Sequence, residues 1–232
     1  MKYLKLKNLL VINSFFFFFF IIFFFIFPKS DIHFSHLFFE NNFFISEKYP
    51  YIKTLRSFLK DLMVIISIIS LVVLIVYNFK IFNKGANKLN KRLKFSIIGL
   101  IIGPIIGSGL IANWYFKDQW GRARPIQVKE FGGEKEFTRA FLKTDQCKKN
   151  CSWISGESSA AFSFLVGTLI LKHPLFFFIN LFFGLVVSFC RISMGGHFLS
   201  DNLFALFFML YLAIAYKYFV IKIIKRVPRK NV

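Results

Sequence analysis

Six long apolar segments constrain this chain more than any other feature of its sequence. The first of them, residues 9–27, runs for 19 residues without a charged side chain. An α-helix needs about 20 apolar residues to cross a bilayer, and a chain inside lipid must satisfy its backbone hydrogen bonds within a helix or a closed barrel. The predicted spans are residues 9–27, 62–79, 95–116, 154–171, 174–190 and 203–221. We therefore predict an all-α fold, a polytopic integral membrane bundle of six transmembrane helices.

The composition favours a membrane protein over a soluble one. Hydrophobic residues make up 56% of the 232 residues, and the mean hydropathy is +0.58. The net charge of +20, from 31 Lys and Arg against 11 Asp and Glu, would suggest a nucleic-acid partner for a soluble protein. Here the basic residues lie in loops and tails between the apolar segments. We therefore expect no nucleic-acid partner, and we assign the positive charge to anionic headgroups, membrane topology or a phosphorylated substrate.

The predicted spans divide the chain into three parts. Residues 1–94 hold two spans, an interfacial segment and a basic loop; residues 95–221 hold a core of four spans; residues 222–232 form a basic tail. Between the first two spans, the stretch "SDIHFSHLFFENNFF" is expected to form an amphipathic helix at the membrane surface. His33 and His36 lie in it, but no third metal ligand is evident, so we interpret them as interfacial side chains.

Basic residues that flank the spans predict the orientation, because cytoplasmic ends carry an excess of Lys and Arg. With six spans, both termini and the loop after the second span fall on one side, which we predict to be cytoplasmic. The flanking basic residues on that side are Lys2, Lys5, Lys7, Lys80, Lys84, Lys88, Lys91, Arg92, Lys94, Lys217, Lys222, Lys225, Arg226, Arg229 and Lys230. Loop 117–153 carries nine Lys and Arg on the opposite, outer side, and we attribute this excess to a bound anion.

Three polar clusters share one side of the membrane in either orientation, because the loops after the third and fifth spans lie where the fourth span begins. These clusters are "KDQWGRARP", "WISGESS" and "RISMGGHFLSD". Lys117, Arg124 and Arg191 would supply positive charge for phosphate oxygens. Ser155 and Gly156, at a helix start, would add free backbone N–H groups. Together the clusters predict an anion-binding site.

His197 and Asp201 supply the reactive part of this constellation. They are four residues apart, so on one helical turn the carboxylate can orient the imidazole and stabilise its positive form. The second ring nitrogen is then free to act as a nucleophile or a base. An anion site beside an oriented histidine predicts phosphoryl transfer through a phosphohistidine.

The same residues resemble the motifs of the type-2 phosphatidic acid phosphatase superfamily of membrane lipid phosphatases. The matching positions are Lys117, Arg124-Pro125, Ser155-Gly156, Arg191, His197 and Asp201, and the resemblance covers about residues 95–215. It implies a lipid phosphatase that needs no metal and no other cofactor. The residues it assigns to phosphate binding are Lys117, Arg124, Ser155, Gly156 and Arg191. It makes His197 the nucleophile and Asp201 the residue that orients it.

Glu157 departs from the family pattern, which has a histidine at this position as the general acid for the leaving oxygen. The resemblance therefore implies that Glu157 takes the role of the acid, since a bound phosphate dianion would favour its protonated form. The alternative is an ion pair between Glu157 and Arg191 or Lys117, with water protonating the leaving group.

One branch of the superfamily, the bacterial lipid A 4'-phosphatases, is similar in having an acidic residue at this point. That branch also resembles this chain in "KDQWGRARP", in the paired cysteines of "QCKKNCSWISGE" and in "GGHFLSD". The likeness implies removal of the 4'-phosphate of lipid A at the periplasmic face of the bacterial inner membrane. The alternatives are another lipid phosphate (phosphatidic acid, phosphatidylglycerol phosphate or undecaprenyl diphosphate) or a non-catalytic protein that binds anionic lipids.

Cys147 and Cys151 lie on the predicted periplasmic side, where disulfides persist. Three residues separate them, which allows a small closed loop. We predict a disulfide that holds the loop ahead of Ser155; two free thiols are the alternative. Cys190 is expected to be a buried, small apolar residue.

Overall fold

The computed structural model describes residues 6–78, 90–171 and 173–226, and it is helical along most of this length. The long helices are α1 (Leu6–Ile26), α4 (Tyr51–Asn78), α5 (Lys91–Pro104), its continuation as the π-helix η1 (Ile105–Lys117), α9 (Pro174–Ser193) and α10 (Leu199–Arg226). The short helices are α2 (Ser30–His36), α3 (Ile45–Lys48), α6 (Asp118–Trp120), η2 (Pro125–Gln127), η3 (Lys129–Phe131), α7 (Gly156–Ser163) and α8 (Leu165–Thr168). In the described residues the strands β1 (Phe39–Glu40) and β2 (Phe43–Phe44) form one antiparallel hairpin.

Five helices are long and apolar enough to cross a membrane in the described parts of the chain. They are Leu6–Ile26, Tyr51–Tyr77, Lys91–Lys117, Pro174–Ser193 and Leu199–Lys225. The prediction of an all-α polytopic membrane bundle is therefore confirmed. The predicted count of six full-length spans is not reached, because residues 154–171 form the two short helices α7 and α8 instead.

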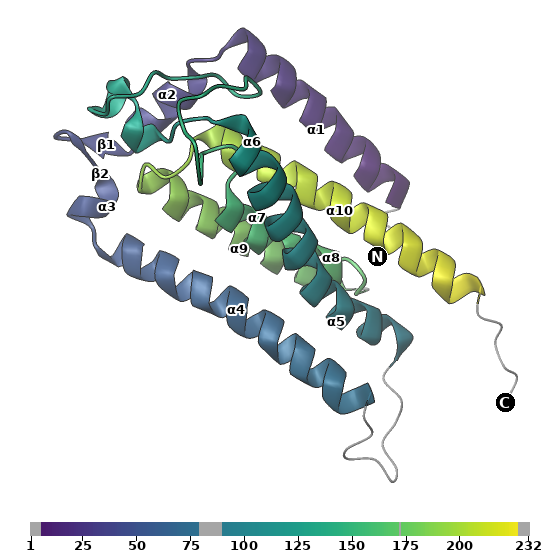
Figure 1. The fold of residues 1–232 in the computed structure, drawn as a ribbon. Helices are drawn as coiled ribbons and strands as arrows, with labels where there is room; N and C mark the ends of the chain where they lie inside the picture. Colours follow the sequence, from purple (N-terminus) through teal and green to yellow (C-terminus); the bar gives the residue numbers. More distant parts are fainter. Residues whose placement is uncertain (1–5, 79–89, 172, 227–232) are drawn as a thin grey trace, which may run out of the picture.

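Helices α7 and α8 are short and partly polar because protein surrounds them. α7 packs against α9, α10 and η1, and α8 packs against α5 and α10, so both lie in the middle of the bundle (Figure 1). The buried Ser158 hydroxyl donates to Asn202 Oδ1 at 2.6 Å. A lipid-facing helix would need a full apolar span, whereas a helix enclosed by protein can bury hydroxyls that find partners there.

Helix α4 begins at Tyr51, well before the predicted start at residue 62. Pro50 directly precedes it, and proline is favoured at a helix start because its missing N–H is not needed there. The predicted loop 28–61 is therefore too long, and Arg56 is carried by a helix. The predicted interfacial helix is present in shorter form as α2, and the β1–β2 hairpin follows it.

The polar connections gather at one end of the bundle. In Figure 1, α2, the hairpin, the long segment after η1 and the turn between α9 and α10 lie together, away from the first turn of α1 and the last turn of α10. The loops after the predicted third and fifth spans thus share one end, as the alternation of spans predicts. Several residues used to predict the orientation lie outside the described residues, namely Lys2, Lys5, Lys80, Lys84, Lys88, Arg229 and Lys230.

Close packing of α5 against α7 and α8 depends on glycine. A Cβ atom on Gly99 would lie 2.7 Å from the Cα of Gly167, and one on Gly103 would lie 2.3 Å from the carbonyl oxygen of Ser163. Such distances are too short for any side chain, so the backbones can approach only with glycine at these positions. This contact sets η1, with Lys117 at its end, beside the start of α7.

Candidate active site

His197 lies buried in the turn between α9 and α10. Its Nδ1 is 2.8 Å from the carbonyl oxygen of Ser152 and 3.5 Å from Oδ2 of Asp201. A carbonyl can only accept a hydrogen bond, so Nδ1 carries the proton and Nε2 keeps its lone pair. Burial is the main cause that lowers the pKa of His197 to about 3. At neutral pH the ring is therefore uncharged, with one nitrogen available as a nucleophile.

Asp201, in the first turn of α10, is held from several directions. Its carboxylate accepts from Arg122 Nη1 at 2.7 Å, from the backbone N–H of Phe198 at 2.8 Å and from the hydroxyl of Ser152. The sequence predicted that Asp201 orients His197 from the same helical turn. Instead His197 precedes the helix, and its closest acceptor is the Ser152 carbonyl, with the Asp201 carboxylate next in distance.

Lys117 and Arg124 meet at the side chain of Asn150. Lys117 Nζ donates to Asn150 Oδ1 at 3.1 Å, and Arg124 Nη2 donates to the same oxygen at 2.9 Å. The backbone of Arg124 is extended, as expected for a residue before proline. Two of the three predicted phosphate-binding cations are therefore joined by one amide oxygen. Asn150 was not predicted from the sequence, because a single asparagine in a loop belongs to no recognisable motif.

Arg191, the third predicted cation, is buried near the end of α9. Its Nη1 is 3.6 Å from Glu157 Oε1, and its Nε finds no acceptor among the described residues. A buried donor without a partner costs about 1–3 kcal/mol, so this guanidinium is suited to an added anion. Gly196 leaves room for it, because a Cβ atom there would lie 2.6 Å from Arg191 Nη2.

The start of α7 lies against Lys117. Ser155 is the N-cap and accepts from the backbone N–H of Ser158 at 3.4 Å. A Cβ atom on Gly156 would lie 3.0 Å from Lys117 Nζ and 2.5 Å from Asn113 Oδ1. Glycine therefore permits the lysine to approach the helix start.

Glu157 pairs with Arg56 of α4, a residue that the sequence did not indicate. Arg56 Nε donates to Glu157 Oε2 at 2.8 Å, and Arg56 Nη2 donates to Oε1. Of the two partners considered from the sequence, Arg191 lies near the carboxylate, and Lys117 makes its hydrogen bond to Asn150 instead. Arg56 was missed because residues 51–61 were predicted to belong to a loop.

A disulfide joins Cys147 and Cys151, whose Cα atoms are 5.6 Å apart. Asn150 lies inside this small loop and presents its side chain to Lys117 and Arg124. The bridge thus closes the segment that carries the amide between the two cations. Cys190 is a buried free cysteine.

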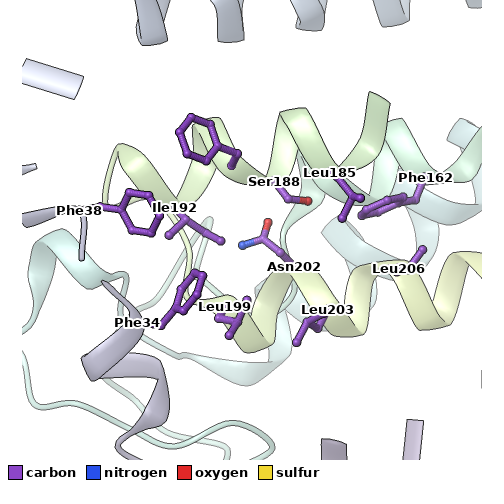
Figure 2. Close-up of a pocket in the computed structure, with 11 residues that line it drawn as sticks. Phe34, Phe38, Phe162, Leu185, Ser188, Ile192, Leu199, Asn202, Leu203 and Leu206 are labelled. Atoms are coloured by element: carbon purple, nitrogen blue, oxygen red, sulfur yellow. The ribbon is translucent and has the colours of Figure 1, made fainter. Parts of the chain in front are cut away.

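Two hollows lie near these residues. A groove of about 490 Å³ between α4 and η1 reaches Lys117, Gly156 and Glu157, with Met63, Val64 and Ile68 among its apolar lining. A smaller cavity of about 160 Å³ is almost wholly apolar. Figure 2 shows Phe34 and Phe38 at one end of it and Phe162 and Leu206 at the other. None of the predicted site residues lines the smaller cavity, whereas Lys117, Gly156 and Glu157 line the groove.

Several known proteins are similar to this chain in sequence. The family model described as the PAP2 superfamily matches residues 94–225. A lipid A 4'-phosphatase of Francisella tularensis subsp. novicida is 35% identical over 185 residues, which is 77% of this chain and 81% of the relative. A lipid A 4'-phosphatase of Rhizobium leguminosarum is 33% identical over 114 residues, 48% of this chain and 47% of the relative. No solved structure shows significant similarity. The chain belongs to the PAP2 superfamily.

Proposed function

We propose that this lipid phosphatase removes the 4'-phosphate of lipid A through a phosphohistidine, at the periplasmic face of a bacterial inner membrane and without a metal. The observation that carries the proposal is the buried imidazole of His197, whose Nδ1 donates to the Ser152 carbonyl at 2.8 Å and leaves Nε2 with its lone pair. Arg191 and Lys117 are among the charged groups that act on this ring. The lipid A substrate is supported by the two relatives described above, both of which are named lipid A 4'-phosphatase.

In the first step, the lone pair of His197 Nε2 attacks phosphorus, and the bond from phosphorus to the sugar oxygen breaks. The imidazole gains positive charge while its Nδ1 proton stays bonded to the Ser152 carbonyl, 2.8 Å away. The Asp201 carboxylate, 3.5 Å from Nδ1, stabilises this charge. In the second step, water attacks phosphorus, the N–P bond breaks, and inorganic phosphate leaves.

The phosphoryl group would be held by Lys117, Arg124 and Arg191, with the backbone of Ser155 and Gly156 at the start of α7. Arg191 supplies a buried Nε that lacks an acceptor among the described residues, and a phosphate oxygen would satisfy it. Phosphoryl transfer needs mainly positioning and charge stabilisation from the protein. This cradle supplies both.

Glu157 is proposed to carry the proton. With a phosphate dianion bound to Arg191, the carboxyl group is protonated and gives its proton to the leaving oxygen in the first step. It then takes a proton from the attacking water in the second step. The carboxyl group therefore ends the cycle with the proton that it had at the start. The pairing with Arg56 supports a second role, in which Glu157 stays ionised and water supplies the proton. The pH dependence of turnover separates the two roles, because only the first role gives a pH limb that reports Glu157 and disappears in Glu157→Gln.

The groove between α4 and η1 supports a substrate that arrives from the membrane. Its apolar lining along α4 leads towards Lys117 and Glu157. Acyl chains could remain among such side chains while the phosphorylated head reaches the cations. This arrangement fits a lipid better than a soluble phosphate ester.

The test is phosphate release from lipid A by the purified protein in detergent, followed by mass spectrometry of the lipid. We expect loss of one phosphate with the intact protein and none with His197→Ala, whereas His33→Ala retains activity. An acid-labile phosphoryl adduct on the protein would support the intermediate. Equal activity of the intact protein and His197→Ala would contradict the mechanism. Release from phosphatidic acid but not from lipid A would contradict the substrate.

A further inference from the structure

Asp31, in α2, belongs to a buried charge network that ends at Asp201. Arg122 Nη2 donates to Asp31 Oδ2 at 2.8 Å, and Arg122 Nη1 donates to Asp201 Oδ1 at 2.7 Å. The three side chains are at most 1% exposed. One guanidinium therefore joins two carboxylates from opposite ends of the sequence. Burial raises the pKa of Asp31 and the guanidinium opposes this shift; with both carboxylates ionised, the group would carry one net negative charge.

Ser200 strengthens the link between α2 and α10. Its backbone N–H donates to Asp31 Oδ1 at 2.9 Å, and its hydroxyl donates to Asp31 Oδ2 at 2.6 Å. Asp31 thus binds a free N–H at the start of the helix that carries Asp201. A shift of Asp31 would move the first turn of α10.

The guanidinium of Arg122 is fully buried and held by contacts within the protein, so it is not available to bind a substrate phosphate. Its Nε donates to the carbonyl of Thr138 at 2.9 Å, and its guanidinium lies 4.3 Å from the ring centroid of Phe198. Although Arg122 stands in the same short motif as Arg124, its donors are used inside the protein. Its contacts make it a connection between Asp31 and Asp201.

We propose that Asp31 is a positioning residue for the phosphoryl transfer and acts on His197 through Arg122 and Asp201. This inference rests on the proposed function. Without Asp31, Arg122 would pair with Asp201 alone and neutralise its charge. Phosphorylation makes the imidazole of His197 positive, so the transition state needs the negative charge that Asp201 keeps while Arg122 is shared.

Asp31 would add a positioning residue from outside the part of the chain that matches the family. Asp31 lies outside the matched residues 94–225, in the segment between α1 and α4. The side chains that hold the proposed nucleophile would therefore come partly from a segment that the family match does not include. Swapping that segment for another surface loop would cost turnover even with every family motif intact.

The test compares Asp31→Asn with Glu40→Gln, a matched loss of one carboxylate on the same segment. Glu40 is exposed and pairs only with Lys48 among the described residues. Asp31→Asn is expected to lower kcat roughly 10- to 100-fold, by analogy with the loss of a group that orients a metal-bound histidine, with KM changed by no more than about twofold. Glu40→Gln should match the unchanged protein. An unchanged kcat in Asp31→Asn would overturn the proposal.

A second variant and an NMR measurement test the same network independently of the folding of Asp31→Asn and of turnover. If Asp31→Asn does not fold, Arg122→Lys is the second variant. It keeps one positive charge but carries all its donors on one nitrogen, so it cannot keep the spread contacts of the guanidinium to Thr138, Asp201 and Asp31, and the same selective loss of kcat is expected. Wild-type kcat in Arg122→Lys would contradict the network. Nitrogen-15 NMR of His197, in a chain with His33, His36 and His173 replaced by Gln, needs no turnover. Its Nδ1 proton signal should shift in Asp31→Asn and not in Glu40→Gln, so failure of the inference is distinct from failure of the proposed function.

Discussion

Arg56 on α4 donates two hydrogen bonds to the carboxylate of Glu157 at the start of α7, and it links helices whose paired residues are 101 positions apart. Glu157 stands where the family pattern has a histidine. The ion pair brings a fourth cation to the site, beside Lys117, Arg124 and Arg191. It also couples the wall of the groove to the proposed proton carrier.

Arg56→Gln should lower kcat/KM because the site loses one of its four cations. It should also move the pH dependence that Glu157 sets to higher pH, because Glu157 would lose the cation that favours its ionised form. The matched control is Lys53→Gln, one helical turn earlier, whose partner is the exposed Glu47. In a double-mutant cycle, Arg56→Gln and Glu157→Gln should couple by about 0.5–3 kcal/mol. Additive losses in kcat/KM would show that the pair does not act as a unit.

Gly156→Ala should weaken substrate binding by displacing Lys117 from the start of α7. The new methyl group would lie 3.0 Å from Lys117 Nζ and 2.5 Å from Asn113 Oδ1, and both are ends of flexible side chains. The variant should therefore fold. KM should rise by roughly 10-fold, the equivalent of one hydrogen bond to a charged group. The control is the same substitution in a Lys117→Met background, where the lysine is already absent and KM should not rise further; an equal fold-rise in both backgrounds would contradict the placement of Lys117.

His197 should remain uncharged from neutral to mildly acid pH, since burial lowers its pKa to about 3. The unfolded chain takes up this proton near pH 6.5. Folding therefore loses stability as the pH falls from about 6.5 towards 3, and His197 contributes no pH dependence above that range. The thermal midpoint in detergent should fall less steeply between pH 7 and 4 for His197→Gln than for the unchanged protein. Parallel curves would argue against a buried neutral histidine.

Reduction of the Cys147–Cys151 bridge should raise KM more than it lowers kcat. The bridge closes the loop that holds Asn150 against Lys117 and Arg124. Ser152, whose carbonyl holds His197, lies just outside the closed loop, and it is also fixed by its N–H to the Arg122 carbonyl and by its hydroxyl to Asp201. We expect a rise of roughly 10-fold in KM, as for loss of one hydrogen bond to a charged group. The double variant Cys147→Ser/Cys151→Ser should reproduce this rise and no longer respond to a reductant. Cys190→Ala, which removes the buried free thiol, should still respond.

Local pattern was enough to predict the helical membrane fold and the clusters around Lys117, Ser155 and His197. Apolar length decides which segments can lie in lipid, and alternation of spans decides which loops share an end. It was not enough to predict where each helix begins. Arg56 was assigned to a loop because charged residues interrupt the apolar pattern, although a helix can carry them at the membrane surface.

The sequence by itself determined that this chain lies in a membrane and gathers cations, a helix start and one histidine at a single end, because each of these follows from residues close together in the chain. Only the tertiary structure decided the partners of those residues. The pairing of Arg56 with Glu157, the guanidinium of Arg122 between Asp31 and Asp201, and the Ser152 carbonyl on His197 all join distant segments. Their physical cause is burial: a charged or polar group inside the bundle must find a partner there, and only the packing of the helices decides which partner is within reach.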